Sequence, residues 1–189
     1  MIGISAPPTA LELFFERPAT QVARALIGAE FFLQGTGGVI VETEAYASDD
    51  PASHSFKGQS VQNRAMYNSS GSVYVYRSYG IHWCLNFVCL PGIALLLRAI
   101  EPKMGIALMM SRRNINNPLL LSSGPGRLCQ ALAVNGGLNG RSLMDTPFHL
   151  TLPKEPASLS VGTRIGISKA IDLPWRFGLK GSPFLSKRF

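Results

Sequence analysis

Two glutamates and a tyrosine alternate along an apolar stretch of the chain, Val41-Glu-Thr-Glu-Ala-Tyr46. Alternate side chains of a β-strand lie on the same face, so Glu42, Glu44 and Tyr46 should point the same way. Because a charge among apolar neighbours is costly unless it is paired, we expect at least one carboxylate to be desolvated or bound to a cation. Such a carboxylate is a candidate general base. The alternative is a solvated sheet edge without a chemical role.

A second stretch, from Val73 to Gly80, is rich in tyrosine. The alternation places Tyr74 and Tyr76 on one face and Tyr79 near the tip of a hairpin. Aromatic rings stack on unpaired bases, and an apolar or aromatic tip can wedge into a base step. The alternative is that these tyrosines only stabilise the strand, for which tyrosine is a favourable residue.

Two polar residues interrupt apolar strands. Arg98 needs an acidic or phosphate partner, and Glu42 or Glu44 is the obvious candidate; a purely structural ion pair fits as well. Asn86 lies within Trp83-Cys-Leu-Asn-Phe-Val88. An amide there is either a hydrogen-bonded residue of the core or a pocket group that recognises the edge of a base.

The composition narrows the class of protein. The 189 residues include 18 Lys+Arg and 11 Asp+Glu, which gives a net charge of +7 and a pI near 9.7. This excess of positive charge favours a polyanionic partner, of which nucleic acid is the commonest. The scattered cysteines and histidines indicate neither a disulfide framework nor a metal site, and we expect no metal. With no signal peptide and no membrane span in the sequence, we expect an intracellular protein without a membrane partner.

The elements that position these residues are short and separated by frequent Gly and Pro. The patterns predict an α+β fold with a largely antiparallel sheet, formed as one domain over residues 1–189. The expected helices cover 18–28, 103–114 and 122–134. The expected strands cover 30–34, 39–46, 73–79, 82–88 and 94–99, with a hairpin at Gly35–Gly38, a long loop over 48–72 and short strands after Phe148.

One motif has to be rejected. Leu90-Pro-Gly-Ile93 looks like the hairpin of helix-hairpin-helix DNA-binding proteins, but that motif requires a helix on each side. Here the flanking segments are predicted strands. Phosphate-binding glycine loops, nucleotide fingerprints and nucleophile elbows are also missing from the sequence.

Taken together, these pieces resemble the alkyladenine DNA glycosylase family, also called methylpurine or 3-methyladenine DNA glycosylases. The resemblance runs in order from Leu13 to Ser186, and although each short match is weak, the ordered set is specific. The matching segments are Ile40–Tyr46, His54-Ser55, Asn63-Arg64, Tyr74–Tyr76, Tyr79-Gly80, Asn86, Leu96–Pro102, Ser123–Pro125, Leu128–Ala133, Arg164–Gly166 and Gly181–Pro183.

The resemblance implies a role for each matching position. Glu44 matches the general base that activates water, and Arg98 the residue that positions it. The remaining matches are Tyr46 and Tyr76 as the aromatic walls around a flipped base, His54 as a lining residue, Asn86 as the group that disfavours guanine, Ile167 as a backbone contact to the water, and Tyr79 as the intercalating residue. The implied fold is a single domain around a curved antiparallel sheet with a protruding hairpin and flanking helices.

The implied function is base-excision repair of duplex DNA by a monomeric enzyme without a cofactor. Candidate lesions are 3-methyladenine, 7-methylguanine, hypoxanthine and ethenoadenine. No lysine lies in the matching pocket motifs, so we expect a monofunctional glycosylase without a Schiff-base lyase step. The expected compartment is the cytoplasm or nucleoid of a bacterium, or otherwise the nucleus. Two alternatives are a non-catalytic damaged-DNA-binding module of the same fold and a nucleoside hydrolase, which would leave the charge unexplained.

Overall fold

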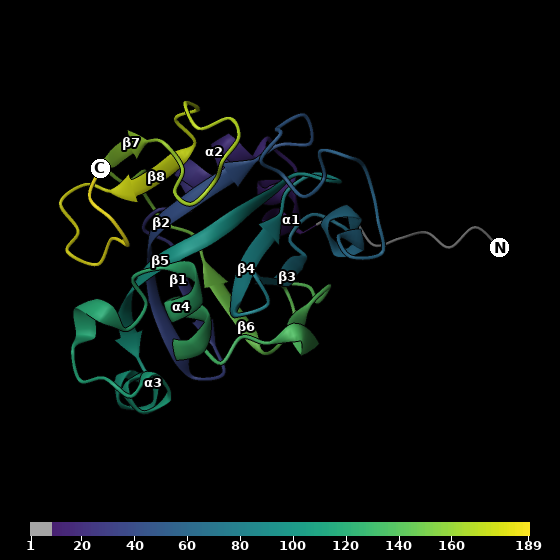
Figure 1. Cartoon of the computed structure of the whole chain (residues 1–189). Helices are drawn as coiled ribbons and strands as arrows, with labels where there is room; N and C mark the ends of the chain where they lie inside the picture. The colour runs from purple at the N-terminus through teal and green to yellow at the C-terminus, as the bar shows by residue number, and fades with distance from the viewer. Residues whose placement is uncertain (1–8) are drawn as a thin grey trace.

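The computed structural model describes residues 9–189 and contains one eight-stranded sheet with four α-helices around it (Figure 1). The strands are β1 (Glu30–Leu33), β2 (Thr36–Tyr46), β3 (Val73–Ser78), β4 (His82–Val88), β5 (Ala94–Met104), β6 (Phe148–Thr151), β7 (Leu159–Gly162) and β8 (Arg176–Leu179). The helices are α1 (Ala10–Phe15), α2 (Ala19–Ala25), α3 (Ile106–Arg113) and α4 (Pro125–Ala131), with short 3-10 turns at 64–67, 118–120 and 136–138. The predicted α+β class and antiparallel sheet are confirmed.

The strand order β3-β4-β5-β2-β1-β6 places β2 and β5 at the centre of the sheet, and Figure 1 shows β5 running across the molecule. The first part of β2 pairs with β1, whereas Glu42–Glu44 pair with β8 on one side and with β5 on the other. The hairpin of β3 and β4 joins β5 through three residue pairs, from Asn86↔Leu96 to Val88↔Ala94. All these pairings are antiparallel, as predicted.

The two faces of the central sheet differ in composition. One face packs into the main hydrophobic core together with residues of α1, α2 and α4. This core includes Val73, Val75, Leu85, Phe87, Leu95 and Leu97. The alternate residues of the same strands line a cavity on the opposite face: Tyr74, Tyr76, Cys84, Asn86, Ala94, Leu96 and Arg98. The period of two in the sequence therefore separates the core from the candidate site.

The first helix was not predicted. α1 begins after Thr9, whose hydroxyl accepts from the Glu12 amide at 3.2 Å while the Glu12 carboxylate accepts from the Thr9 amide at 2.6 Å. This reciprocal pair is a capping box, and its Thr-x-x-Glu spacing was available in the sequence. The predicted helix over 18–28 is confirmed as α2, which ends before Gly28 at φ +92°.

Two predicted boundaries were wrong for local reasons. The helix expected over 103–114 starts only at Ile106, because β5 continues through Met104 and Gly105 turns the chain at φ +68°. The first hairpin turns at Gln34-Gly35, both at positive φ, and not over Gly35–Gly38. Gly38 lies inside β2, where a Cβ atom would stand 1.9 Å from the Glu101 carbonyl oxygen, so the close approach of β5 requires glycine there.

Other expectations hold with small changes of length. The strands predicted over 73–79 and 82–88 are β3 and β4, and Leu90–Ile93 connects two strands, which confirms the rejection of the helix-hairpin-helix motif. The helix predicted over 122–134 is the shorter α4. Within residues 9–189, no helix combines the length and apolar character that crossing a bilayer requires.

Candidate active site

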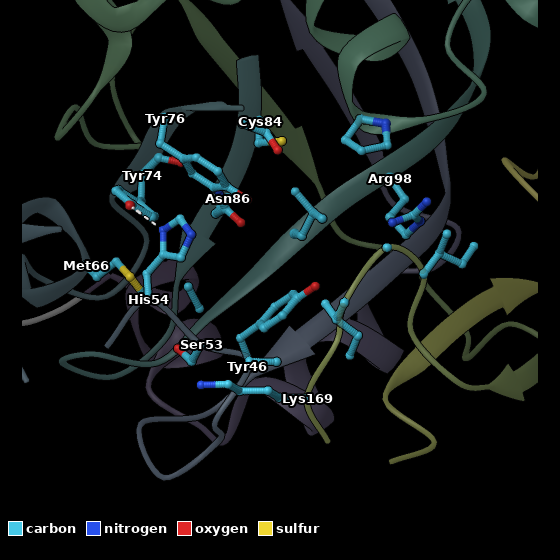
Figure 2. A pocket seen from close by; sticks show the side chains of 18 of the residues that line it. Tyr46, Ser53, His54, Met66, Tyr74, Tyr76, Cys84, Asn86, Arg98 and Lys169 are labelled. Atoms are coloured by element: carbon cyan, nitrogen blue, oxygen red, sulfur yellow. Dashed lines mark hydrogen bonds between the residues drawn. The ribbon is translucent and has the colours of Figure 1, made fainter. Parts of the chain in front are cut away.

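A cavity of about 670 Å³ opens on the face of the sheet that lies opposite the main core. Figure 2 shows its side chains converging from β2, β3, β4, β5 and two loops. The first loop is 48–72, which follows β2, and the second is the segment 164–170, which precedes β8. This volume is in the range of pockets that bind small molecules or single nucleotides.

One wall of the cavity is aromatic. The Tyr74 and Tyr76 rings stack at 5.4 Å with an interplanar angle of 26°, and the His54 ring lies 4.4 Å from Tyr76. His54 is fixed by a 2.8 Å hydrogen bond between its Nδ1 and the Tyr74 hydroxyl, drawn as a dashed line in Figure 2. Burial lowers the pKa of His54 below its usual 6.5, which favours the neutral imidazole. Burial also raises the pKa of Tyr74 to about 12, and that of Tyr76 further.

Tyr46 lies on the other side of the cavity (Figure 2) and is held from behind. Its hydroxyl donates to Glu44 Oε2 at 2.9 Å, and the Arg164 guanidinium lies 4.6 Å from the centre of its ring. Burial and the neighbouring Glu44 carboxylate raise the pKa of Tyr46 well above its usual value, so the hydroxyl remains a donor. The ring is thus held as a rigid surface facing an open volume.

Glu44 is fully buried and does not itself line the cavity, but three lining residues contact it: Tyr46, Arg98 and Ile165. Its Oε1 forms an ion pair with Arg98 Nη1 at 3.1 Å and accepts a hydrogen bond from the Ile165 amide at 2.8 Å. Its other oxygen, Oε2, accepts only from Tyr46 among the described residues. The predicted sharing of one face by Glu42, Glu44 and Tyr46 is confirmed, because Arg98 contacts both carboxylates and Tyr46 contacts Glu44.

Arg98 lies at an irregularity in the sheet. The β2–β5 register pairs Glu42 with Ala99 and Thr43 with Leu97, so Arg98 has no opposite residue on β2. Such bulges redirect side chains and are frequent beside active sites. Arg98 reaches Glu42 at 3.3 Å as well as Glu44, and both its acidic partners are the ones that the sequence indicated.

The remaining predicted residues are placed as follows. Asn86 lines the cavity and is held by a 3.0 Å bond from its Nδ2 to the Tyr74 carbonyl. Tyr79 lies at the tip of the β3–β4 hairpin and is 88% exposed, with φ +50°. Ile167 lines the cavity, but the backbone group that touches Glu44 is the amide of Ile165.

Sequence reasoning missed the roles of Arg164 and Asp50. Arg164 forms an ion pair with Asp50 in which both side chains are fully buried, and its Nη1 donates to the Ala45 carbonyl at 3.0 Å. This pair anchors segment 164–170 beside β2 and so brings the Ile165 amide to Glu44. An Asp and an Arg 114 residues apart give no local signal in a single sequence.

Lys169 also lines the cavity (Figure 2). The matching motifs contain no lysine, as stated above, but the residues that follow the Arg164–Gly166 match also line the cavity, and Lys169 is one of them. Its side chain is exposed. The absence of lysine from the matching motifs therefore does not by itself exclude a Schiff-base step.

The arrangement has a definite chemical capacity. A planar ring can enter between Tyr46 and the Tyr76–His54 wall, and the buried Glu44 carboxylate lies next to this space, bonded to the Tyr46 hydroxyl. Within residues 9–189, His, Cys, Asp and Glu side chains nowhere gather in threes as a metal site would require. These features fit an aromatic ligand and a carboxylate that acts as a general base on a bond at the edge of the ligand ring.

Comparison with known proteins agrees with this geometry. Residues 13–183 match the family described as methylpurine-DNA glycosylase (MPG). A protein of Agrobacterium fabrum is 60% identical over 98% of this chain and 96% of its own length, and one of Rhizobium meliloti is 57% identical over 93% and 95%. Both relatives carry the name "Putative 3-methyladenine DNA glycosylase". The chain therefore belongs to the methylpurine-DNA glycosylase family of base-excision repair enzymes.

Proposed function

We propose that this protein flips alkylated purines out of duplex DNA and hydrolyses their N-glycosidic bond with a water activated by Glu44. The observation that carries the proposal is the buried Glu44 carboxylate, contacted by Tyr46, Arg98 and the Ile165 amide, which all belong to residues that line the aromatic cavity. We expect its second oxygen, Oε2, to accept the proton of the attacking water.

The flipped base is expected to stack between Tyr46 and Tyr76, with His54 at the edge. Alkylation at N3 or N7 makes a purine cationic, and a cation is attracted to the faces of aromatic rings by about 0.5–2 kcal/mol. A damaged base also costs less to unstack from the duplex than a normal one. Both effects favour methylated purines over intact ones.

Hydrolysis then requires little more than a positioned water. The N-glycosidic bond breaks with its electron pair passing to the purine, and the developing positive charge on the sugar is stabilised by the nearby Glu44 carboxylate. The water oxygen bonds to C1′ while its proton passes to Glu44 Oε2, leaving a free base and an abasic site. The Tyr46 hydroxyl donates a hydrogen bond to Oε2, and we expect this bond to break or lengthen when a base stacks on the Tyr46 ring.

Tyr79 is expected to fill the gap that the flipped nucleotide leaves in the duplex. Its side chain is 88% exposed at the hairpin tip and is therefore available to contact DNA. Insertion of such a wedge between base steps is a common way to stabilise deformed DNA. The net charge of +7 supplies the attraction to the phosphate backbone.

The deciding experiment is a single-turnover excision assay on labelled duplexes, each carrying one 3-methyladenine, 7-methylguanine, hypoxanthine or ethenoadenine. Wild type should release at least one of these bases, and Glu44→Gln should bind the same duplexes without releasing any. Full activity of Glu44→Gln would remove Glu44 from the mechanism. Salt-dependent binding without excision by wild type would instead indicate a damaged-DNA-binding module.

We also propose that the enzyme is monofunctional, in spite of the position of Lys169. The test is borohydride trapping on a duplex with an abasic site, comparing wild type with Lys169→Ala. A covalent adduct that forms with wild type and is lost in Lys169→Ala would establish a lyase step and overturn this proposal.

A further inference from the structure

Glu42 is as deeply buried as Glu44, and neither carboxylate lines the cavity directly. Its Oε1 accepts from Arg176 Nη1 at 3.0 Å, from the Ser186 hydroxyl at 2.9 Å and from Arg98 Nε at 3.3 Å. Its Oε2 accepts from the Ser186 amide at 2.5 Å. Glu42 therefore joins three segments that are distant in sequence: β5, β8 and the residues around Ser186.

Arg98 is shared between the two carboxylates. Its Nε faces Glu42 and its Nη1 faces Glu44, while its Nε and Nη2 both donate to the Ser186 hydroxyl, at 3.3 Å and 3.2 Å. A planar guanidinium fixed on one edge has little freedom on the other. The direction in which Arg98 meets Glu44 is thus set by Glu42 and Ser186.

Arg176 completes the charge balance. Two carboxylates and two guanidinium groups form the cluster, and none of the four residues is more than 6% exposed. Arg176 is itself held by the carbonyl groups of Lys187 and Arg188 and lies 3.7 Å from the centre of the Phe189 ring. Because solvent screens such buried charges poorly, removing one of them should act strongly on the others.

We propose that Glu42, Arg176 and Ser186 form a positioning unit that fixes Arg98 against Glu44 and balances the charge around it. This inference rests on the proposed role of Glu44 as the general base. The three residues act through Arg98 and do not touch the substrate. Glu42 would thus tune the basicity of Glu44 rather than serve only as a structural ion pair.

The unit predicts shifts of opposite sign. Glu42→Gln leaves two cations beside Glu44, which stabilises its ionised form and should move the acidic limb of the excision-rate profile to lower pH. Arg176→Met leaves two carboxylates sharing one cation, which should move that limb to higher pH. Each shift should be about one pH unit or more.

The titratable and charged groups that face Glu44 come from several elements. They are Glu42 and Tyr46 of β2, Arg98 of β5, Arg176 of β8, Arg164, Tyr76 of β3 and Cys84 of β4.

The experiment measures single-turnover excision between pH 5 and 9 for wild type, Glu42→Gln and Arg176→Met on one lesion duplex, so that the titration of the lesion itself is common to all. Glu101→Gln is the matched control, since Glu101 carries the same charge on the adjacent strand in a partly exposed pair with Lys103. Its profile should coincide with that of wild type. Thermal unfolding of every variant identifies those that are folded at the assay temperature.

Ser186→Ala and Ser186→Thr provide a milder test. Loss of the hydroxyl should lower the single-turnover rate by roughly tenfold while duplex affinity stays constant, because the charge-assisted hydrogen bonds that orient Arg98 are removed. Ser186→Thr keeps the hydroxyl and should recover most of the rate. This pair of variants decides the proposal if Glu42→Gln or Arg176→Met fails to fold.

The outcomes separate the two proposals. Opposite shifts, or a rate loss in Ser186→Ala that Ser186→Thr restores, support the positioning unit. Identical profiles in all folded variants, or shifts of the same sign, overturn it while Glu44 remains the base. Full activity in Glu44→Gln overturns the proposed function itself.

Discussion

The Arg164 guanidinium lies against Tyr46, 4.6 Å from the centre of its ring, while it is paired with the fully buried Asp50. The next residue along the chain, Ile165, donates its amide to Glu44. One buried ion pair thus supports an aromatic wall and the carboxylate beneath it. Asp50 belongs to the long loop after β2, so this loop has a structural task in addition to carrying His54.

Asp50→Asn should lower the free energy of unfolding by about 3–5 kcal/mol, because it leaves the buried Arg164 without its counter-ion. Urea denaturation monitored by tryptophan fluorescence measures this difference. Glu101→Gln removes one partner of a partly exposed pair and should cost no more than about 1 kcal/mol. Equal losses in the two variants would contradict the assigned importance of the buried pair.

Tyr46→Phe should keep the stacking surface and remove the hydroxyl that occupies Glu44 Oε2. Because that bond stabilises the carboxylate, its loss should move the acidic limb of the excision profile to higher pH, with duplex affinity preserved. Tyr46→Leu should weaken affinity for the lesion as well, by about 1–3 kcal/mol for one lost stacking partner. If Tyr46→Leu binds the lesion as tightly as Tyr46→Phe, the ring does not stack on the base.

Tyr79→Ala should leave thermal stability unchanged, since the side chain is 88% exposed. Its effect should fall on affinity for lesion duplexes and on the single-turnover rate, each reduced roughly tenfold by the loss of the wedge. Fluorescence anisotropy and the excision assay measure the two quantities. Leu13→Ala removes an exposed apolar side chain from α1 and is the control. Wild-type affinity and rate in Tyr79→Ala would exclude intercalation.

The lowered pKa of His54 predicts a pH-dependent stability. Between that lowered pKa and 6.5, the unfolded chain binds a proton at His54 that the folded chain does not. The free energy of unfolding therefore rises with pH through this window, and the contribution of His54 to it is lost as the pH falls. His54→Gln should show a shallower dependence there than wild type, measured by urea denaturation at successive pH values. Parallel curves would mean that His54 titrates normally in the folded protein.

Sequence patterns predicted the parts of the fold that depend on local alternation. β4 matches its expected range, and the alternation of β2 places Glu42, Glu44 and Tyr46 on one face. The long-range parts could not be predicted in this way. The pairing of Asp50 with Arg164 and of Glu42 with Arg176 depends on how the chain after β7 returns to β2.

Backbone contacts were equally hidden from pattern reasoning. The Ile165 amide bonds to Glu44 whatever its side chain is, so no residue type marks it. Glycine commonly marks turns, so the sequence pattern predicts Gly38 in a turn, but the close approach of Glu101 is what requires glycine there. The segment around Lys169 has no periodic pattern that would place it beside the cavity.

The hairpin that carries Tyr76 and Tyr79 meets the rest of the sheet through only the three pairs from Asn86↔Leu96 to Val88↔Ala94. The hairpin is attached to β5 only at the end that begins at Asn86, and α4 packs against one side of it, where Gly126 lies close to His82 near the tip. A small rotation at the root becomes a larger displacement at Tyr79. The same lever leaves Glu44 undisturbed, because that carboxylate is anchored in the stiff centre between β5 and β8. In the proposed complex with DNA, we expect Tyr79 to adjust its position by this rotation while the contacts of Glu44 stay unchanged.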